Sequence, residues 1–199
     1  SDQNTVLESG NIKVNFYKNT LYDDRYIDFK VSSDTLFLHE DTIPLQKNFY
    51  INYDLSNYKA EHRDKIFIAR LYGYYKKPSY VSTKRKNNIL SASSKVLGTY
   101  ALAMDTIAPK IKPVNFQDKK WLSKYRFLKV TIEDDLSGIS KYRASVNGQW
   151  ILMEYDYKKK TLTHDFNDNV VKDTKNKLKI IVTDNVGNSS TFEATFFRK

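Results

Sequence analysis

Four short polar stretches in the second half of the chain decide its fold: residues 105–109 (DTIAP), 134–139 (DDLSGI), 147–150 (NGQW) and 183–190 (TDNVGNSS). Glycine readily adopts positive φ, and Asp and Asn side chains bond to their own backbone, so these stretches predict turns. Between them, apolar residues alternate with polar ones, which buries one face of a strand and leaves the other in water. The pattern predicts a small all-β sandwich.

The strand signals of residues 105–199 number about seven, the usual count for an immunoglobulin-like or fibronectin type III-like sandwich. Trp150 precedes an apolar run and is expected to be a central core residue, and one or two helical turns are expected near residues 117–124. The expected strands cover residues 110–116, 127–133, 139–146, 150–157, 161–166, 177–183 and 190–197.

The first half of the chain predicts a second β-sandwich over residues 1–104, with six or seven strands and a loose start at residues 1–10. Residues 66–72 are apolar on both faces, as in a central strand, and residues 75–88 indicate an exposed hairpin or loop. Pro109 and other prolines nearby restrict the backbone, so a stiff joint is expected before the second domain, residues 105–199.

The composition restricts the possible chemistry. There is no cysteine, which excludes disulfides and thiolate metal sites, and no run approaches the ~18 apolar residues of a membrane span. Ser1 is not an initiator methionine, so we expect a processed or truncated chain from which any export signal would already be gone. The net charge of +10 indicates either a solvated basic surface or attraction to an anionic partner, such as cell wall, lipid or nucleic acid.

A cluster of tyrosines and cations within residues 74–86 is the candidate ligand-binding surface. Exposed tyrosines stack on sugars or contact proteins, while cations attract anionic glycan or lipid head groups. No nucleic-acid-binding motif accompanies the cluster, so nucleic acid is not an expected partner, and a merely solubilising loop is the simpler alternative. The candidate residues are Tyr74, Tyr75, Lys76, Lys77, Tyr80, Lys84 and Arg85.

Oxygen-bearing side chains in the two polar turns are calcium candidates. Calcium takes six to eight oxygen ligands, and loops at one pole of a sandwich would bring these turns together. The alternative is ordinary turn chemistry, in which the same side chains cap backbone amides, and no other cofactor is expected. The candidates are Asp134, Asp135, Asp184 and Asn188, with Asn185 beside them.

The remaining catalytic possibilities are weak. The three histidines, His39, His62 and His164, lack the spacing of a zinc site and are expected to be structural or exposed. Paired carboxylates could hydrolyse glycosides. The candidate acidic residues for such a reaction are Glu133, Asp134, Asp135, Glu154 and Asp156.

Residues 41–50 (DTIPLQKNFY) and 97–109 (LGTYALAMDTIAP), together with the polar turns above, carry a family resemblance. The chain resembles the non-catalytic C-terminal region of Gram-negative envelope zinc metallopeptidases of the lysostaphin type. Peptidases of that family hold zinc through an early His…Asp pair and a later His-x-His, and neither pattern occurs here. The resemblance therefore implies a module without the catalytic zinc site.

These observations predict a non-enzymatic accessory module of a peptidoglycan-directed envelope protein, located in the periplasm or at the cell surface. Its expected partners are a cell-wall polymer or an envelope protein, and a catalytic domain encoded upstream. A free-standing surface adhesin or carbohydrate-binding protein is the alternative, and a glycosidase-like enzyme is a third possibility.

Overall fold

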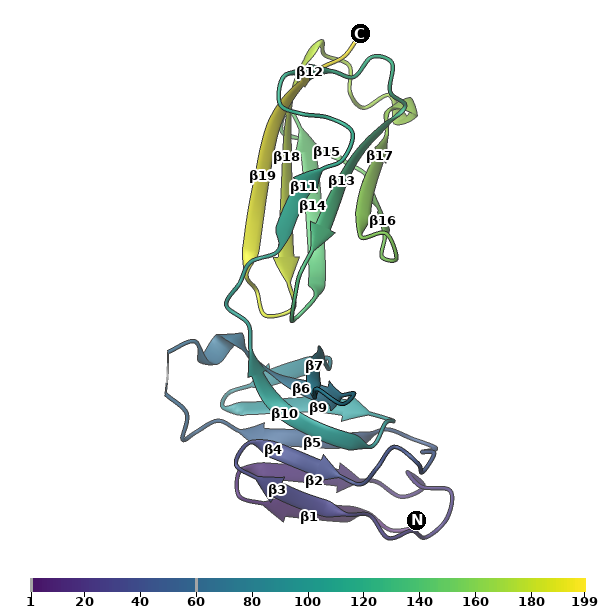
Figure 1. Ribbon diagram of the computed structural model, residues 1–199, viewed down its shortest axis with the longest axis vertical. Helices are drawn as coiled ribbons and strands as arrows, with labels where there is room; N and C mark the ends of the chain where they lie inside the picture. Colours follow the sequence, from purple (N-terminus) through teal and green to yellow (C-terminus); the bar gives the residue numbers. More distant parts are fainter. Residues whose placement is uncertain (1, 60) are drawn as a thin grey trace. The chain divides into compact units, whose positions relative to one another are not determined.

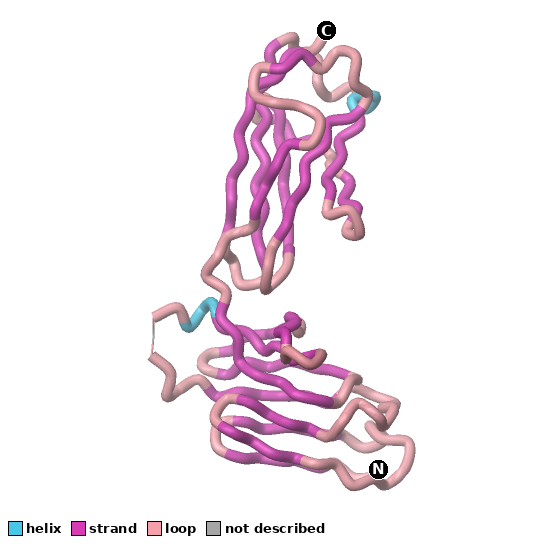
Figure 2. Tube along the Cα trace, viewed as in Figure 1, coloured by secondary structure: helices cyan, strands magenta, loops and turns pink. Residues whose placement is uncertain are grey.

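The computed structural model describes residues 2–59 and 61–199 and divides the chain into two compact units, Ser1–Asp105 and Thr106–Lys199. In the described residues all regular structure is β-strand except two short 3-10 helices, η1 (Arg63–Lys65) and η2 (Phe166–Asp168), as Figure 2 shows. Neither is long and apolar enough to cross a lipid bilayer. The predicted all-β fold class is confirmed.

The first unit is a sandwich of two five-stranded antiparallel sheets (Figure 1). One sheet has the order β1-β2-β5-β9-β8, and the other has the order β3-β4-β10-β6-β7. In the first sheet the strands are β1 (Thr5–Ser9), β2 (Ile12–Phe16), β5 (Phe49–Asp54), β9 (Ile89–Ser94) and β8 (Thr83–Lys86). In the second they are β3 (Phe29–Ser32), β4 (Thr35–Leu38), β10 (Gly98–Met104), β6 (Ile66–Tyr72) and β7 (Lys77–Tyr80).

Alternation along the strands builds the core of the first unit between its two sheets. In β5, the side chains of Phe49, Ile51 and Tyr53 are fully buried, while the residues between them point outward or are only half-buried. Leu36 and Tyr100 of the opposite sheet belong to the same buried cluster. Each such side chain stabilises the fold by about 1.5–3 kcal/mol relative to an exposed position.

The second unit is also a two-layer sandwich, with sheet orders β11-β13-β17-β16 and β12-β19-β18-β14-β15. The first order reproduces strands A, B, E and D of an immunoglobulin domain, and the second contains the G-F-C arrangement. Strands of the first sheet are β11 (Lys110–Pro113), β13 (Phe127–Glu133), β17 (Thr161–Asp165) and β16 (Glu154–Asp156). The others are β12 (Lys120–Trp121), β19 (Ser189–Phe197), β18 (Lys175–Asp184), β14 (Ile139–Val146) and β15 (Gln149–Ile151).

The core of the second unit corrects one expectation about Trp150. Ile132, Val182 and Phe196 are fully buried, but Trp150 is 55% exposed. Trp150 lies on β15 opposite Ser145, and the next residue, Ile151, is the one that points into the core. Successive strand residues face opposite sides, so an error of one residue reverses the assignment.

Four further expectations were wrong. Residues 1–10 contain strand β1, and each unit has more strands than expected, ten in the first and nine in the second among the described residues. Residues 75–88 do not form a hairpin, because β7 pairs with β6 and β8 pairs with β9 of the other sheet. Residues 117–124 contain no helix; they contain β12, which pairs in parallel with β19.

Candidate binding surfaces

The turn between β6 and β7 presents two tyrosines to solvent. Tyr74 is 93% exposed and Tyr75 is 82% exposed, and their rings meet edge to face with centroids 5.2 Å apart. Gly73 and Lys76 both have positive φ, and the Lys76 N–H donates to the Gly73 carbonyl, which closes the turn. The turn therefore projects an aromatic pair beside a cation. We call Tyr74, Tyr75, Lys76 and Lys77 the tyrosine–lysine turn.

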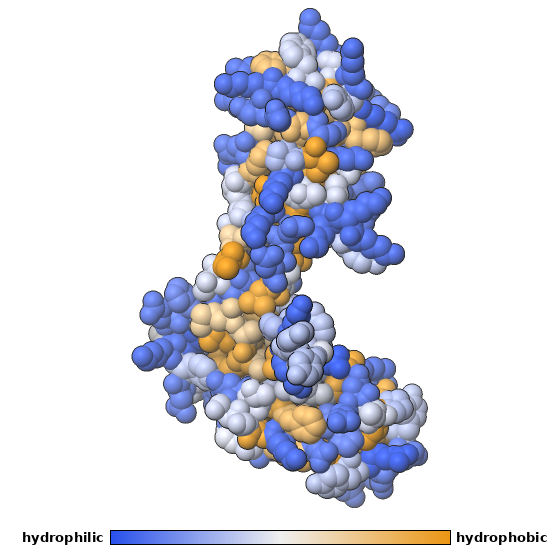
Figure 3. Space-filling model, viewed as in Figure 1, coloured by the Kyte–Doolittle hydropathy of each residue, from blue (hydrophilic) through white to orange (hydrophobic). Residues whose placement is uncertain are grey.

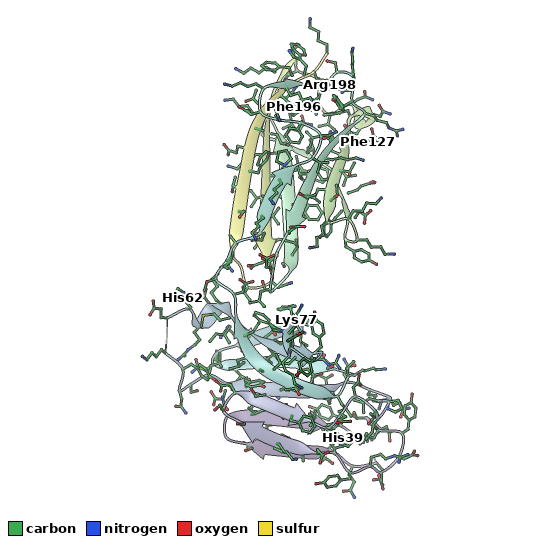
Figure 4. All side chains as sticks on the ribbon, viewed as in Figure 1. His39, His62, Lys77, Phe127, Phe196 and Arg198 are labelled. Carbon is green, nitrogen blue, oxygen red and sulfur yellow. The ribbon has the colours of Figure 1, made fainter. Side chains whose placement is uncertain are left out.

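Lys77 begins β7, where it pairs with Tyr72, and Figure 4 labels its side chain. Tyr80, at the end of β7, serves the fold instead. Its ring centroid lies 5.3 Å from that of the buried Phe67, and its hydroxyl accepts a hydrogen bond from the Thr83 N–H at 3.3 Å. Tyr80 therefore covers the outer side of β6, while the tyrosine–lysine turn lies in solvent.

Lys84 and Arg85 lie apart from the tyrosine–lysine turn. Arg85 donates to the carbonyl of Ile66, at the start of β6, whereas the turn follows the last residue of β6, Tyr72. At about 3.3 Å per residue, the length of β6 separates the two groups by about 20 Å. The structure thus brings four of the seven candidate residues together in the turn after β6. It places Lys84 and Arg85 near the other end of β6.

Arg85 has a clear structural role. Its Nη2 donates to the carbonyl oxygens of Arg63 at 2.6 Å and Ile66 at 3.1 Å, which fixes η1 against the start of β6. Burial lowers the pKa of the Arg85 guanidinium from its ordinary value, and the nearby Asp64 opposes that shift. The guanidinium remains a cation, because the ordinary arginine pKa is far above neutrality.

The edge positions of β7 and β8 also explain some of the lysines in residues 74–86, with no need for a ligand. Each is the edge strand of its sheet. Exposed edges invite pairing with other chains, and proteins block them with lysine and proline. Lys77 and Pro78 on β7, and Lys84 on β8, fit that pattern.

The two acidic turns of the second unit meet at one pole of its sandwich. The Asn185 side-chain amide donates to the carbonyl of Ser137 at 2.7 Å, and the Asn185 N–H donates to that of Gly138 at 3.0 Å. One carboxylate oxygen of Asp134 and one of Asp184 lie within 4.8 Å of each other. The juxtaposition on which the calcium prediction depends is therefore present.

Those carboxylates already accept hydrogen bonds from their own turns. Asp134 Oδ2 accepts from the Gly138 N–H at 2.6 Å and the Leu136 N–H at 3.2 Å. Asp184, which is 2% exposed, accepts from the N–H of Asn188 at 2.8 Å and from its side-chain amide at 2.7 Å. These contacts are the capping geometry of Asx turns, so the turns have a structural explanation that needs no ion.

Asp135 differs from the other calcium candidates because it points to solvent. Lys110 Nζ lies 2.7 Å from its Oδ2, and this hydrogen bond, with the lysine charge, lowers the pKa of the Asp135 carboxyl and raises that of the Lys110 ammonium. Both side chains are exposed, so the pair contributes little to stability.

The histidines are scattered. His39 Nδ1 lies 2.9 Å from Asp28 Oδ2, and Figure 4 shows His39 and His62 on different sides of the first unit. His164 is buried in the second unit, with Nδ1 2.9 Å from the Leu152 carbonyl. Over residues 2–59 and 61–199, no group of three or more metal-ligating side chains includes a histidine.

The acids considered for glycoside hydrolysis also have ordinary surroundings. Glu133 lies 3.6 Å from Lys160, and Asp156 caps the turn after β16 by accepting from the N–H groups of Lys158 and Lys159. These hydrogen bonds lower the pKa of the Asp156 carboxyl, and the bond from the Lys159 N–H has the largest effect. Such an acid is ionised at neutral pH and unsuited to donate a proton.

Sequence reasoning missed one surface, a cleft in the first unit formed by residues 17–27 over β1 and β2. The signal was available: this strand-free segment holds Tyr17, Tyr22 and Tyr26, all more than half exposed. Figure 3 shows that hydrophilic residues cover most of the visible face of each unit, with smaller apolar areas between them.

Together, the fold and these surfaces define a class: a tandem β-sandwich module that presents exposed tyrosines and cations. Residues 1–105 match the family model of the Zu5-like domain, so the chain belongs to the Zu5-like domain family. No curated protein matches the sequence.

The solved structures that are similar to this chain include a mannanase and fibronectin(III)-like modules. An endo-beta-1,4-mannanase from Thermotoga petrophila aligns with a TM-score of 0.39 and 9% identity, covering 48% of this chain and 20% of its own. The fibronectin(III)-like modules of Clostridium thermocellum CbhA align with a TM-score of 0.36 and 12% identity, covering 77% of this chain and 86% of theirs. Neither is a lysostaphin-type peptidase, and neither likeness bears on what this chain binds.

Proposed function

We propose that this chain is a non-catalytic binding module of an exported protein, and that it contacts cell-wall polymer through the tyrosine–lysine turn. The observation that carries the proposal is the exposure of Tyr74 and Tyr75 at 93% and 82%. Exposing the apolar faces of two adjacent rings to water is unfavourable, and such pairs are typical of surfaces that bind a partner.

The chemistry of the turn fits a glycan that carries negative charge. The tyrosine rings offer apolar faces for the C–H groups of sugars, and Lys76 and Lys77 offer ammonium groups to acidic substituents. The net charge of +10 adds long-range attraction to the same class of polymer.

The finer proposal, from the lysostaphin-type resemblance, is that the module positions a cell-wall peptidase in the periplasm or at the cell surface. The reading frame upstream of Ser1 tests it. A peptidase domain containing His-x-His in that frame supports an accessory role, whereas a frame without one, combined with glycan affinity, supports a free-standing adhesin or carbohydrate-binding protein.

Co-sedimentation of the purified chain with isolated peptidoglycan tests wall binding itself. We expect the wild-type chain to be retained in the pellet and to be released by salt, because screening weakens the lysine contribution. A chain that stays in the supernatant at low ionic strength would contradict the proposal.

A further inference from the structure

The cleft in the first unit has the build of a ligand site. Its volume is about 320 Å³, and its floor is apolar, from Leu7 of β1, Phe16 of β2 and Leu21 of the loop that follows β2. Small-molecule sites in proteins begin at about 300 Å³, so the cleft suits one ring rather than an extended chain.

The loop that forms the cleft is held in place by backbone bonds. The Thr20 N–H donates to the Tyr17 carbonyl at 3.0 Å, and the Thr20 carbonyl accepts from the Gln46 N–H at 2.8 Å. A β-bridge joins Leu21 to Leu45. A site whose walls are fixed in advance loses less conformational entropy when a ligand binds.

Thr20 provides the observation that points to a ligand. The residue lines the cleft, is 1% exposed, and its side-chain Oγ1 has no hydrogen-bond partner. A buried hydroxyl without a partner is unfavourable and needs an explanation, and Thr20 differs from the buried Tyr53 hydroxyl because Thr20 lines a cleft. A threonine hydroxyl can donate one hydrogen bond and accept two.

The rest of the lining selects the chemistry of the ligand. Tyr17 and Tyr26, which are 52% and 83% exposed, provide aromatic faces, while Asp24 and Arg25 contribute one charge of each sign. Arg25 Nη2 also lies 3.6 Å from Asp23 Oδ2, so this cation is already paired and attracts an anionic ligand less, which favours a neutral one. Apolar faces combined with a buried hydroxyl favour a molecule with both C–H surfaces and hydroxyl groups.

We propose that this cleft binds a single neutral sugar ring, with its C–H face against the tyrosines and one hydroxyl bonded to Thr20 Oγ1. The proposal does not depend on wall binding by the tyrosine–lysine turn, which lies on a different loop. A module could use the cleft for a sugar end group even if the turn binds nothing.

Amide chemical shifts of the isotope-labelled chain, titrated with glucose, galactose, mannose and N-acetylglucosamine at millimolar concentration, test the proposal. We expect at least one sugar to shift residues 17–27. Removing the hydroxyl in Thr20→Val, or the ring in Tyr26→Ala, should weaken binding roughly tenfold, which corresponds to about 1.4 kcal/mol for the lost contact.

Tyr22→Ala is the matched control, because Tyr22 is exposed in the same loop but does not line the cleft, and it should bind like the wild type. No shift with any of the four sugars would overturn the proposal. So would shifts confined to other residues, or wild-type affinity in Tyr26→Ala. Because Tyr26 is largely exposed, that variant remains informative even if Thr20→Val fails to fold.

Discussion

The ring of Tyr74 meets the ring of Tyr75 edge to face, with planes at 87° and centroids 5.2 Å apart. Both rings are largely exposed, at 93% and 82%. Two side chains ordered by each other lose less freedom on binding than two independent ones. This contact is the reason to treat the pair, and not either tyrosine alone, as the binding element.

Arg85 should matter for folding more than for binding. Arg85→Ala removes two hydrogen bonds to the backbone, and we expect the free energy of unfolding to fall by about 1 kcal/mol in urea denaturation. Lys84→Ala, on the same edge strand, is the control and should change stability by less than about 0.5 kcal/mol. Equal stability of the two variants would show that the Arg85 contacts contribute nothing.

Tyr53 should make the first unit sensitive to alkali. Burial raises the pKa of Tyr53 well above its ordinary value of about 10, and burial also raises the pKa of Tyr58 to about 12. The unfolded chain therefore releases these protons first, so the free energy of unfolding falls as the pH rises above about 10.

Tyr53→Phe should flatten that decline and keep neutral-pH stability, because the Tyr53 hydroxyl is buried without a hydrogen-bond partner. Tyr26→Phe, at an exposed tyrosine, is the control and should keep the wild-type slope. Urea denaturation between neutral pH and pH 12 measures both. If the free energy of unfolding of Tyr53→Phe fell with pH as steeply as that of the wild type, Tyr53 would not be the cause of the alkali sensitivity.

The acidic turns of the second unit should hold their shape without calcium. Asp184→Ala removes three hydrogen bonds to the turn and should cost about 1–3 kcal/mol, seen as a lower Tm, while Asp135→Ala should change little. EDTA should leave the wild-type Tm unchanged. A Tm that rises with calcium chloride and returns with EDTA would instead show that the folded chain binds calcium.

Trp150 and Phe196 should differ sharply in their effect on stability. Phe196→Ala empties a fully buried position and should cost about 3–5 kcal/mol, whereas Trp150→Ala at a half-exposed edge position should cost under about 1 kcal/mol. Urea denaturation compares them directly. If the free energy of unfolding fell as much in Trp150→Ala as in Phe196→Ala, Trp150 would be a core residue after all.

Strands with a clear apolar pattern were the most predictable from sequence. The bounds of Phe127–Glu133, Ile139–Val146 and Ile66–Tyr72 coincide with strands β13, β14 and β6. Strand β13 shows a regular period of two, whereas β6 was recognisable as a short run that is apolar on both faces. Trp150 was misplaced because β15 has only three residues and follows a Gly turn. So short a strand does not show which of its residues face the core, and a shift of one residue reverses the assignment.

Nonlocal pairing accounts for the other errors. Strands β7 and β8 follow each other in sequence but pair with different sheets, and Lys120–Trp121 is a strand only because β19 lies beside it. The tyrosines of residues 17–27 were visible in the sequence, but the cleft that they border was not predictable, for the same reason. Its floor comes from β1, which was expected to be loose, and its fixed loop depends on backbone bonds to residues 45–47.

The dissociation constant for isolated peptidoglycan, measured by co-sedimentation for the wild type and the double variant Tyr74→Ala/Tyr75→Ala, tests the central claim most directly. Loss of two stacking rings should weaken binding at least tenfold, since each is worth about 1 kcal/mol or more. Trp121→Ala/Trp150→Ala, which removes two exposed rings from the second unit, is the control and should bind like the wild type. Equal retention of the tyrosine variant and the wild type would contradict the account.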